Sequence, residues 1–152
     1  IRIGSAGGIG AGLQLRDLVI AQGACTDSNY AHLFKLPGTF APIASYDLLR
    51  RAVDKAQELG VRTQVGNVLS EDGFYGGDPE DTGRWADMGV LALEMESAAL
   101  YMNAAKAKRK ALSLLSISDL VLTGESLPAS ERQTSFTQMM EVALSLALPE
   151  GA

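Results

Sequence analysis

The sequence predicts an α/β fold with a mixed, largely parallel central sheet flanked by helices. Short apolar runs typical of buried strands alternate along the chain with segments whose apolar residues recur at the helical period. Glycine-rich or polar turns separate these segments. The chain has 152 residues and is 47% hydrophobic, which is enough for one compact domain with a sizeable core.

Strands are expected wherever a short apolar run is followed by polar residues or glycine. The expected strands are Ile1–Ile3, Leu18–Ala21, Val61–Leu69, Val90–Leu93 and Ala111–Ile117. Two glycine-rich segments predict a turn and a loop, respectively Gly4–Gly10 and Gly73–Pro79. In open α/β sheets ligands bind outside the carboxyl ends of the strands, so the polar residues that follow these runs are candidates for a site.

Three helices are expected. Ser45 can cap the first, whose apolar residues follow the helical period until Gly60 ends it. The stretch Met95–Lys108 has the composition of a second helix. Ser130 and Gln133 have the spacing of a capping box, which predicts the start of a single final helix.

The first residues of the chain predict that the fold extends beyond them. Ile1 already belongs to an apolar strand, with neither a polar lead-in nor an initiator methionine. Natural domains seldom leave the edge of a core strand exposed. We therefore expect strands to precede Ile1, and we expect residues 1–152 alone to be unstable.

Composition disfavours several classes of function. The formal net charge of −5 argues against binding along a nucleic-acid backbone, which requires a basic surface. The chain lacks a run of about 18 apolar residues that would predict a membrane span, and its start does not resemble a secretory signal. One cysteine, Cys25, and one histidine, His32, offer no internal disulfide and little for a metal site. We expect a cytoplasmic protein without a metal.

An anion site is one interpretation of the segment Arg2–Gly8. Arg2 and Ser5 can bind phosphate oxygens, and the glycines allow the backbone to approach an anion closely. The pattern is neither a Walker A loop nor a clean dinucleotide fingerprint. The plainer interpretation is a strand followed by a tight turn, with Arg2 at the surface.

Two carboxylates, Glu94 and Glu96, follow the apolar run that ends at Leu93. Like charges so close together are costly to bury. A ligand rich in hydroxyls could satisfy them, because carboxylates accept hydrogen bonds from sugar OH groups. Alternatively, both belong to the acidic first turn of the helix that follows.

Asp119 and Arg132 are the remaining candidates. An acid at the end of a largely apolar strand can serve as a general acid, although capping and turn aspartates are commoner. Arg132 lies in the expected first turn of the last helix, where a cation opposes the helix dipole. A functional role or a surface ion pair with Glu131 would explain it.

The order and spacing of these motifs resemble the hexameric purine nucleoside phosphorylases of the nucleoside phosphorylase superfamily. The matching stretches are Arg2–Ser5, Leu15–Ile20, Gly23–Ser28, Phe74-Tyr75, Glu94–Glu96, Ser118-Asp119 and Glu131–Thr134. Uridine phosphorylases and related nucleosidases share the Glu-Met-Glu segment, whereas Ser-Asp followed by Glu-Arg-Gln-Thr is more specific to purine phosphorolysis. The resemblance implies one nucleoside phosphorylase domain over residues 1–152, with its first strands missing.

The resemblance also implies a role for each candidate residue. Arg2 and Ser5 would bind phosphate, and Asp119, assisted by Arg132, would protonate N7 of the purine. Glu96 would hold the ribose 2′- and 3′-hydroxyls. Met95 and Glu94 would lie beside the sugar. The base pocket would be lined by Ser5, Ala6, Gly7, Phe74, Leu93, Met95 and Ser118. Leu120 stands where many relatives have histidine.

The implied reaction is reversible phosphorolysis of purine (deoxy)ribonucleosides to free base and (deoxy)ribose 1-phosphate. Phosphate is a co-substrate, and neither a metal nor an organic cofactor would be required. In relatives a neighbouring subunit completes the site, so a homohexamer is expected. Two alternatives stay open. One is a uridine phosphorylase or related nucleosidase, although we find no uracil-reading insertion between Gly73 and Val90. The other is a non-catalytic purine- or phosphate-binding module.

Overall fold

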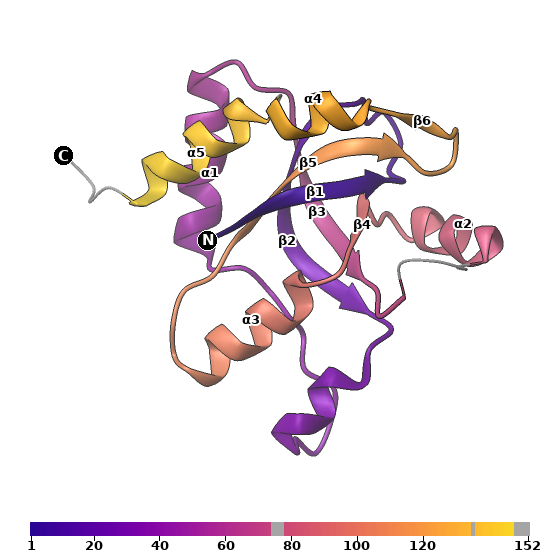
Figure 1. Cartoon of the computed structure of the whole chain (residues 1–152). Coiled ribbons are helices and arrows are strands. Elements are labelled where there is room, and N and C mark those ends of the chain that lie inside the picture. Colours follow the sequence, from indigo (N-terminus) through magenta and orange to yellow (C-terminus); the bar gives the residue numbers. More distant parts are fainter. Residues whose placement is uncertain (74–77, 135, 148–152) are drawn as a thin grey trace.

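The computed structural model describes residues 1–73, 78–134 and 136–147, apart from the side chains of residues 133 and 134. The strands in this part are β1 (Arg2–Gly8), β2 (Leu18–Thr26), β3 (Thr63–Ser70), β4 (Ala92–Glu94), β5 (Ser113–Leu120) and β6 (Glu125–Ser126). The helices are the 3-10 helix η1 (Asn29–Phe34), α1 (Tyr46–Glu58), α2 (Pro79–Asp87), α3 (Ser97–Lys106), α4 (Ala129–Thr134) and α5 (Thr137–Ala147) (Figure 1).

The central sheet closes on itself. Its strand order is β1-β4-β3-β2-β5-β6, and a further pairing joins β5 back to β1. Five strands therefore form a barrel-like ring, with β6 attached to β5. The pairs β1–β5, β2–β3 and β3–β4 are parallel, and the pairs β1–β4, β2–β5 and β5–β6 are antiparallel. The predicted mixed α/β fold is confirmed. Parallel pairing does not predominate in the described sheet, because three strand pairs are antiparallel and three are parallel.

Helices cover the sheet on two sides (Figure 1). Alternate residues of β2 point to opposite faces, as in any strand. Leu18 and Ile20 join an apolar cluster with α1 and α5, whereas Val19 and Ala21 join a second cluster beneath α3. β2 is thus buried on both faces. In β1, by contrast, Ile3 and Ser5 are exposed, so this part of the sheet is open enough to form a site.

The glycine-rich segment is strand from Gly4 to Gly8, which corrects the predicted turn over Gly4–Gly10; the chain first bends at Gly10. β1 continues to Gly8 and pairs with β5 on one side and β4 on the other. A Cβ on Gly7 would lie 2.6 Å from Val121 Cγ2 and 3.1 Å from Asp119 Oδ2. Glycine is needed here because neighbouring side chains press against β1, and the backbone does not turn.

The first predicted helix is confirmed, with one change in its cap. α1 follows Ser45, and Gly60 lies just beyond its end in the left-handed conformation, with φ of 65°. Ser45 Oγ accepts a hydrogen bond from the backbone N–H of Ala111 instead of capping the helix. The hydroxyl therefore joins α1 to the segment that leads into β5.

The final helix is divided into two, which corrects the predicted capping box. α4 already begins at Ala129, so Ser130 lies inside the helix and cannot be its N-cap. α5 begins at Thr137 and buries Met139, Val142 and Leu146 against the core. Helix α2 has no counterpart among the predicted helices. Its N-cap is Asp78, whose carboxylate accepts from Glu80 N–H at 2.9 Å.

Two expectations stay predictions. The structure begins at Ile1, so it does not test whether strands precede that residue. Most of the predicted loop Gly73–Pro79, including Phe74, lies outside the described residues.

Among the helices that are described, none has the length and apolar character to cross a membrane.

Candidate active site

One cavity of about 560 Å³ brings the predicted residues together. It lies along β1 and the ends of β3, β4 and β5. Each predicted site residue that the structure describes contributes to its lining, namely Arg2, Ser5, Ala6, Gly7, Leu93, Glu94, Met95, Glu96, Ser118, Asp119 and Arg132. Gly4, from the candidate anion-binding segment, and Gly73, from the predicted loop, also line the cavity, as do Glu71 and Val121, which sequence analysis does not select.

The antiparallel pairing of β1 with β4 explains why the start of β1 belongs to this site. Gly7 pairs with Leu93, so the chain that leaves β4 at Glu94 runs back along β1 towards Arg2. Arg2 consequently reaches both Glu94 and Glu96. The interpretation of Arg2 as a surface residue is wrong, because its side chain is only 20% exposed.

A β-bulge brings two consecutive residues of β5 into the cavity. Ala6 pairs with Ile117 but Gly7 pairs with Asp119, so Ser118 is an extra residue in the ladder. In a regular strand Ser118 and Asp119 would point to opposite faces, yet both line the cavity. Ser118 Oγ donates to Asp119 Oδ1 at 2.7 Å, which orients the carboxyl group. Because Asp119 lies inside β5, it is not a turn or capping residue.

Arg132 is tied to β5 by two hydrogen bonds through Leu127. The N–H of Leu127 donates to Ser118 O at 2.9 Å, and its carbonyl accepts from Arg132 Nε at 2.9 Å. Helix α4 therefore carries this guanidinium to the same cavity as Asp119. The neighbouring Glu131 forms an ion pair with Arg16.

Glu94 holds the start of α3. It is only 6% exposed, and its carboxylate accepts from Ser70 Oγ, from the N–H of Glu96 at 3.0 Å, and from both N–H and Oγ of Ser97 at 2.9 Å. These contacts satisfy the amides at the helix start. The interpretation of both glutamates as first-turn acids is wrong, because α3 begins at Ser97 and its first turn contains no acidic residue; Glu94 binds these amides from the end of β4. Since both its oxygens are engaged within the protein, Glu94 supports the backbone of Glu96.

A buried polar network continues behind Glu94. Ser97 Oγ lies 2.8 Å from Ser113 Oγ, and Ser113 N–H donates to the hydroxyl of Tyr101 at 3.0 Å. Tyr101 in turn donates to Ala21 O at 2.6 Å, and burial raises the pKa of Tyr101. The network joins α3 to β2 and β5, so the segment Glu94–Glu96 rests on a fixed support.

Replacing Glu94 should destabilise the fold. In Glu94→Ala several buried donors lose their acceptor and the Arg2 guanidinium loses one of its two carboxylate partners, so we expect a loss of about 3–5 kcal/mol in the free energy of unfolding. Glu58→Ala is the matched control, because Glu58 is exposed and forms a surface ion pair with Lys55 along α1. It should change that free energy by less than about 0.5 kcal/mol. Urea unfolding of both variants measures the difference, and equal small changes would refute the structural role.

Arg2 has an unused hydrogen-bond donor at the cavity. Its Nη2 pairs with Glu96, and its Nη1 lies 3.5 Å from Glu94 Oε2, beyond good hydrogen-bond distance. Among the side chains that the structure describes, Nη1 is the one buried polar atom without a hydrogen-bond partner. Leaving such a donor unpaired costs about 1–3 kcal/mol. An anionic ligand in the cavity could supply the missing acceptor.

The lining residues carry an excess of negative charge. Two arginines, Arg2 and Arg132, face four carboxyl groups, Glu71, Glu94, Glu96 and Asp119, which gives a formal charge of −2. Burial, together with the nearby negative charge of Asp27, raises the pKa of Glu71. Additional positively charged groups around this cavity would therefore strengthen the binding of an anion there.

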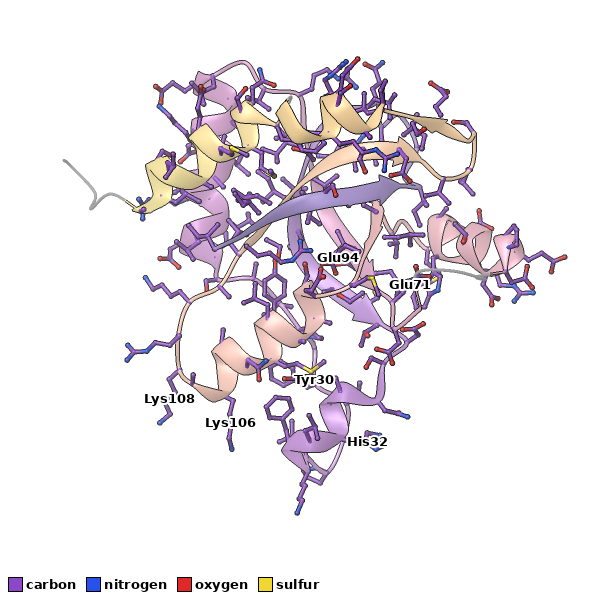
Figure 2. All side chains as sticks on the ribbon, viewed as in Figure 1. Tyr30, His32, Glu71, Glu94, Lys106 and Lys108 are labelled. Atoms are coloured by element: carbon purple, nitrogen blue, oxygen red, sulfur yellow. The ribbon has the colours of Figure 1, made fainter. Side chains whose placement is uncertain are left out.

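No candidate metal site is found among the described residues. Within residues 1–73, 78–134 and 136–147, no group of three or more histidine, cysteine, aspartate and glutamate side chains could hold a metal ion. Figure 2 shows His32 on η1, away from Glu94 and Glu71. His32 does not line the cavity.

Comparison with known proteins identifies the family. The model of a family described as the phosphorylase superfamily matches residues 1–148. The chain belongs to the phosphorylase superfamily. Among curated superfamily members, the DeoD-type purine nucleoside phosphorylase of Geobacillus sp. (strain WCH70) is 49% identical over 151 residues, which are 99% of this chain and 64% of the relative.

Two further relatives carry the same name. The DeoD-type purine nucleoside phosphorylase of Clostridium beijerinckii is 52% identical over 145 residues, or 95% of this chain and 61% of the relative. That of Thermoanaerobacter sp. (strain X514) is 46% identical over 147 residues, or 97% of this chain and 63% of the relative. The chain thus spans about three fifths of the length of these phosphorylase superfamily members.

Proposed function

We propose that this chain carries the reaction centre of a purine nucleoside phosphorylase, a pentosyltransferase of the cytoplasm. It would split purine (deoxy)ribonucleosides with phosphate into free base and (deoxy)ribose 1-phosphate. The observation that carries the proposal is the convergence in one cavity of the residues assigned to phosphate, sugar, base and proton transfer. The names of the relatives, purine nucleoside phosphorylases at 46–52% identity, support it.

Phosphate binding would rearrange the charges around Arg2. A phosphate oxygen would accept from the unpaired Nη1 of Arg2, and Ser5 Oγ would donate to a second oxygen. Glu96, which now pairs with Arg2 and whose side chain is 59% exposed, would turn to the ribose and accept hydrogen bonds from its 2′- and 3′-hydroxyls. The buried Glu94 would keep the backbone of Glu96 in place during this exchange.

The bond to be broken joins C1′ of the sugar to N9 of the base. As it breaks, the electron pair stays on the base and positive charge develops on the sugar. A phosphate oxygen below the sugar stabilises that charge and forms the new bond to C1′. Asp119 would donate a proton to N7, so that the base leaves neutral. The resulting carboxylate would be stabilised by Ser118 Oγ and by the positive charge of Arg132.

The negative charge of the cavity lining supports a site to which residues outside this chain contribute. A formal charge of −2 opposes the entry of phosphate, so we propose that further cations contribute to the site in the assembled protein. The resemblance to hexameric phosphorylases assigns such residues to a neighbouring subunit of a homohexamer. The same resemblance gives the reaction no metal and no organic cofactor.

Base release in the presence and absence of phosphate tests the proposal. The full-length protein is incubated with inosine, adenosine or uridine, and the free base is quantified by chromatography. We expect release of hypoxanthine or adenine only when inorganic phosphate is present. Release from uridine would indicate the pyrimidine-specific alternative, and phosphate-independent release would indicate a nucleosidase. Purine binding without turnover would indicate a binding module.

The role of Arg2 can be separated from the rest of the site. Arg2→Gln removes a charge-assisted hydrogen bond, so KM for phosphate should rise by roughly tenfold or more. The increase in KM for inosine should be smaller. Arg84→Gln is the control, because Arg84 lies on α2, is 70% exposed and does not line the cavity. If Arg2→Gln raised only KM for the nucleoside, the phosphate assignment would be wrong.

A further inference from the structure

Glu71 is a cavity residue to which neither the sequence motifs nor the proposed mechanism assigns a role. It directly follows β3, and its backbone N–H donates to Glu94 O at 2.9 Å (Figure 2). Its side chain lines the cavity. No hydrogen bond or ion pair links its carboxyl group to another side chain in the described part of the chain, so that group is available to a ligand.

Glu71 and Asp119 line the same cavity from two strands that do not pair with each other. The wall runs through the strands in the order β5, β1, β4 and β3, as their pairings show. Asp119 stands near the end of β5, and Glu71 follows the end of β3. Neighbouring strands are about 4.8 Å apart, so β5 and β3, which are three steps apart on this path around the ring, are at most roughly 14 Å apart. Side chains that reach into the cavity from these two strands can therefore contact different edges of one flat ring system.

The chemistry of a purine fixes which edge faces Glu71. If Asp119 reaches N7, as in the proposed function, the edge of the base opposite N7 is the one that carries N3 and C2. In guanine and 2,6-diaminopurine C2 carries an amino group, which is a hydrogen-bond donor. In hypoxanthine and adenine it carries only hydrogen. A glutamate carboxylate accepts hydrogen bonds and so distinguishes these two groups of bases.

We propose that Glu71 determines base specificity by accepting a hydrogen bond from the 2-amino group of the purine. This inference rests on the proposed function. A 2-amino base supplies a donor to a carboxyl group that otherwise faces the negative charge of Asp27. A base without the amino group leaves Glu71 unpaired inside the cavity. Nucleosides of 2-aminopurines are therefore the preferred substrates.

The test compares pairs of substrates that differ only in the 2-amino group. The ratio of kcat/KM for guanosine over inosine, and for 2,6-diaminopurine riboside over adenosine, is measured in the full-length protein. Both ratios should fall by roughly 10- to 100-fold in Glu71→Ala, the range expected for a hydrogen bond to a charged group. Glu71→Gln keeps a carbonyl acceptor and should retain part of both ratios. Asp72→Ala, one residue further along and outside the cavity lining, should change neither.

Failure of this inference is distinct from failure of the proposed function. If the protein cleaves purine nucleosides and Glu71→Ala leaves both ratios unchanged, Glu71 does not read the 2-amino group and the phosphorylase proposal stands. If the protein cleaves no purine nucleoside, the binding of 2-aminopurine, followed by its fluorescence, is compared with that of unsubstituted purine. Loss of the preference for 2-aminopurine in Glu71→Ala would then support the role of Glu71, and an unchanged preference would overturn it.

Discussion

Asp119→Asn should slow phosphorolysis of inosine and adenosine by about 10²–10⁴-fold, the usual cost of losing a general acid. The substitution preserves the shape of the side chain and its hydrogen bond with Ser118 Oγ. It removes the proton that N7 would receive. Without that proton the base must leave as an anion, which raises the barrier. Steady-state kinetics on the purified full-length variant measure the loss.

Substrate choice separates proton donation from a structural role of Asp119. A 7-methylated purine nucleoside already carries the positive charge that protonation would supply, so Asp119→Asn should slow its cleavage far less. Arg132→Ala should show the same substrate dependence more weakly. The two substitutions combined should be non-additive, because both act on one proton transfer. Equal slowing of all three substrates would assign Asp119 to binding or folding.

Glu96→Ala should have the second largest effect, a loss of roughly 10²-fold or more in kcat/KM for inosine. Two hydrogen bonds to a charged acceptor would be removed, each contributing about 1.5–3 kcal/mol. The loss should appear in kcat as well as in KM if these bonds strengthen as charge develops on the sugar.

A dideoxy substrate supplies the control for Glu96. In 2′,3′-dideoxyinosine both hydroxyls are missing, so the unmodified protein and Glu96→Ala should cleave it at similar rates. If Glu96→Ala slowed this substrate as much as inosine, the side chain would act through Arg2 or the start of α3, and not through the sugar.

The family resemblance predicts which residues meet in the site, because it assigns the separate motifs around Arg2, Glu96 and Asp119 to one site. Residue type and spacing alone do not distinguish the roles of the two glutamates. Glu94 and Glu96 stand two residues apart with the same chemistry, yet Glu94 is buried by its bonds to Ser70 and Ser97 whereas Glu96 remains exposed. The burial of Glu94 depends on the pairing of β3 with β4, which brings Ser70 next to it. The local sequence around Glu94 does not predict this pairing.

Two features of the fold depend on long-range contacts. From the sequence, the glycines of β1 predict a turn. In the structure, Gly7 lies in a strand, and the side chains of Val121 and Asp119 leave no room there for a Cβ. The bulge at Ser118 is visible only in the register between β1 and β5. Glu71, in contrast, could have been found. It comes two residues after Leu69, where the predicted strand ends, and polar residues that follow a strand are the criterion that selected Glu94.

The fate of the sugar tests the central claim most directly. The full-length protein is incubated with inosine and inorganic phosphate, and the reaction is followed by phosphorus NMR alongside release of hypoxanthine. We predict that ribose 1-phosphate appears in equal amount to the hypoxanthine released, while inorganic phosphate declines by the same amount. Hypoxanthine accompanied by free ribose, with phosphate unchanged, would contradict the account, because water and not phosphate would then have attacked C1′.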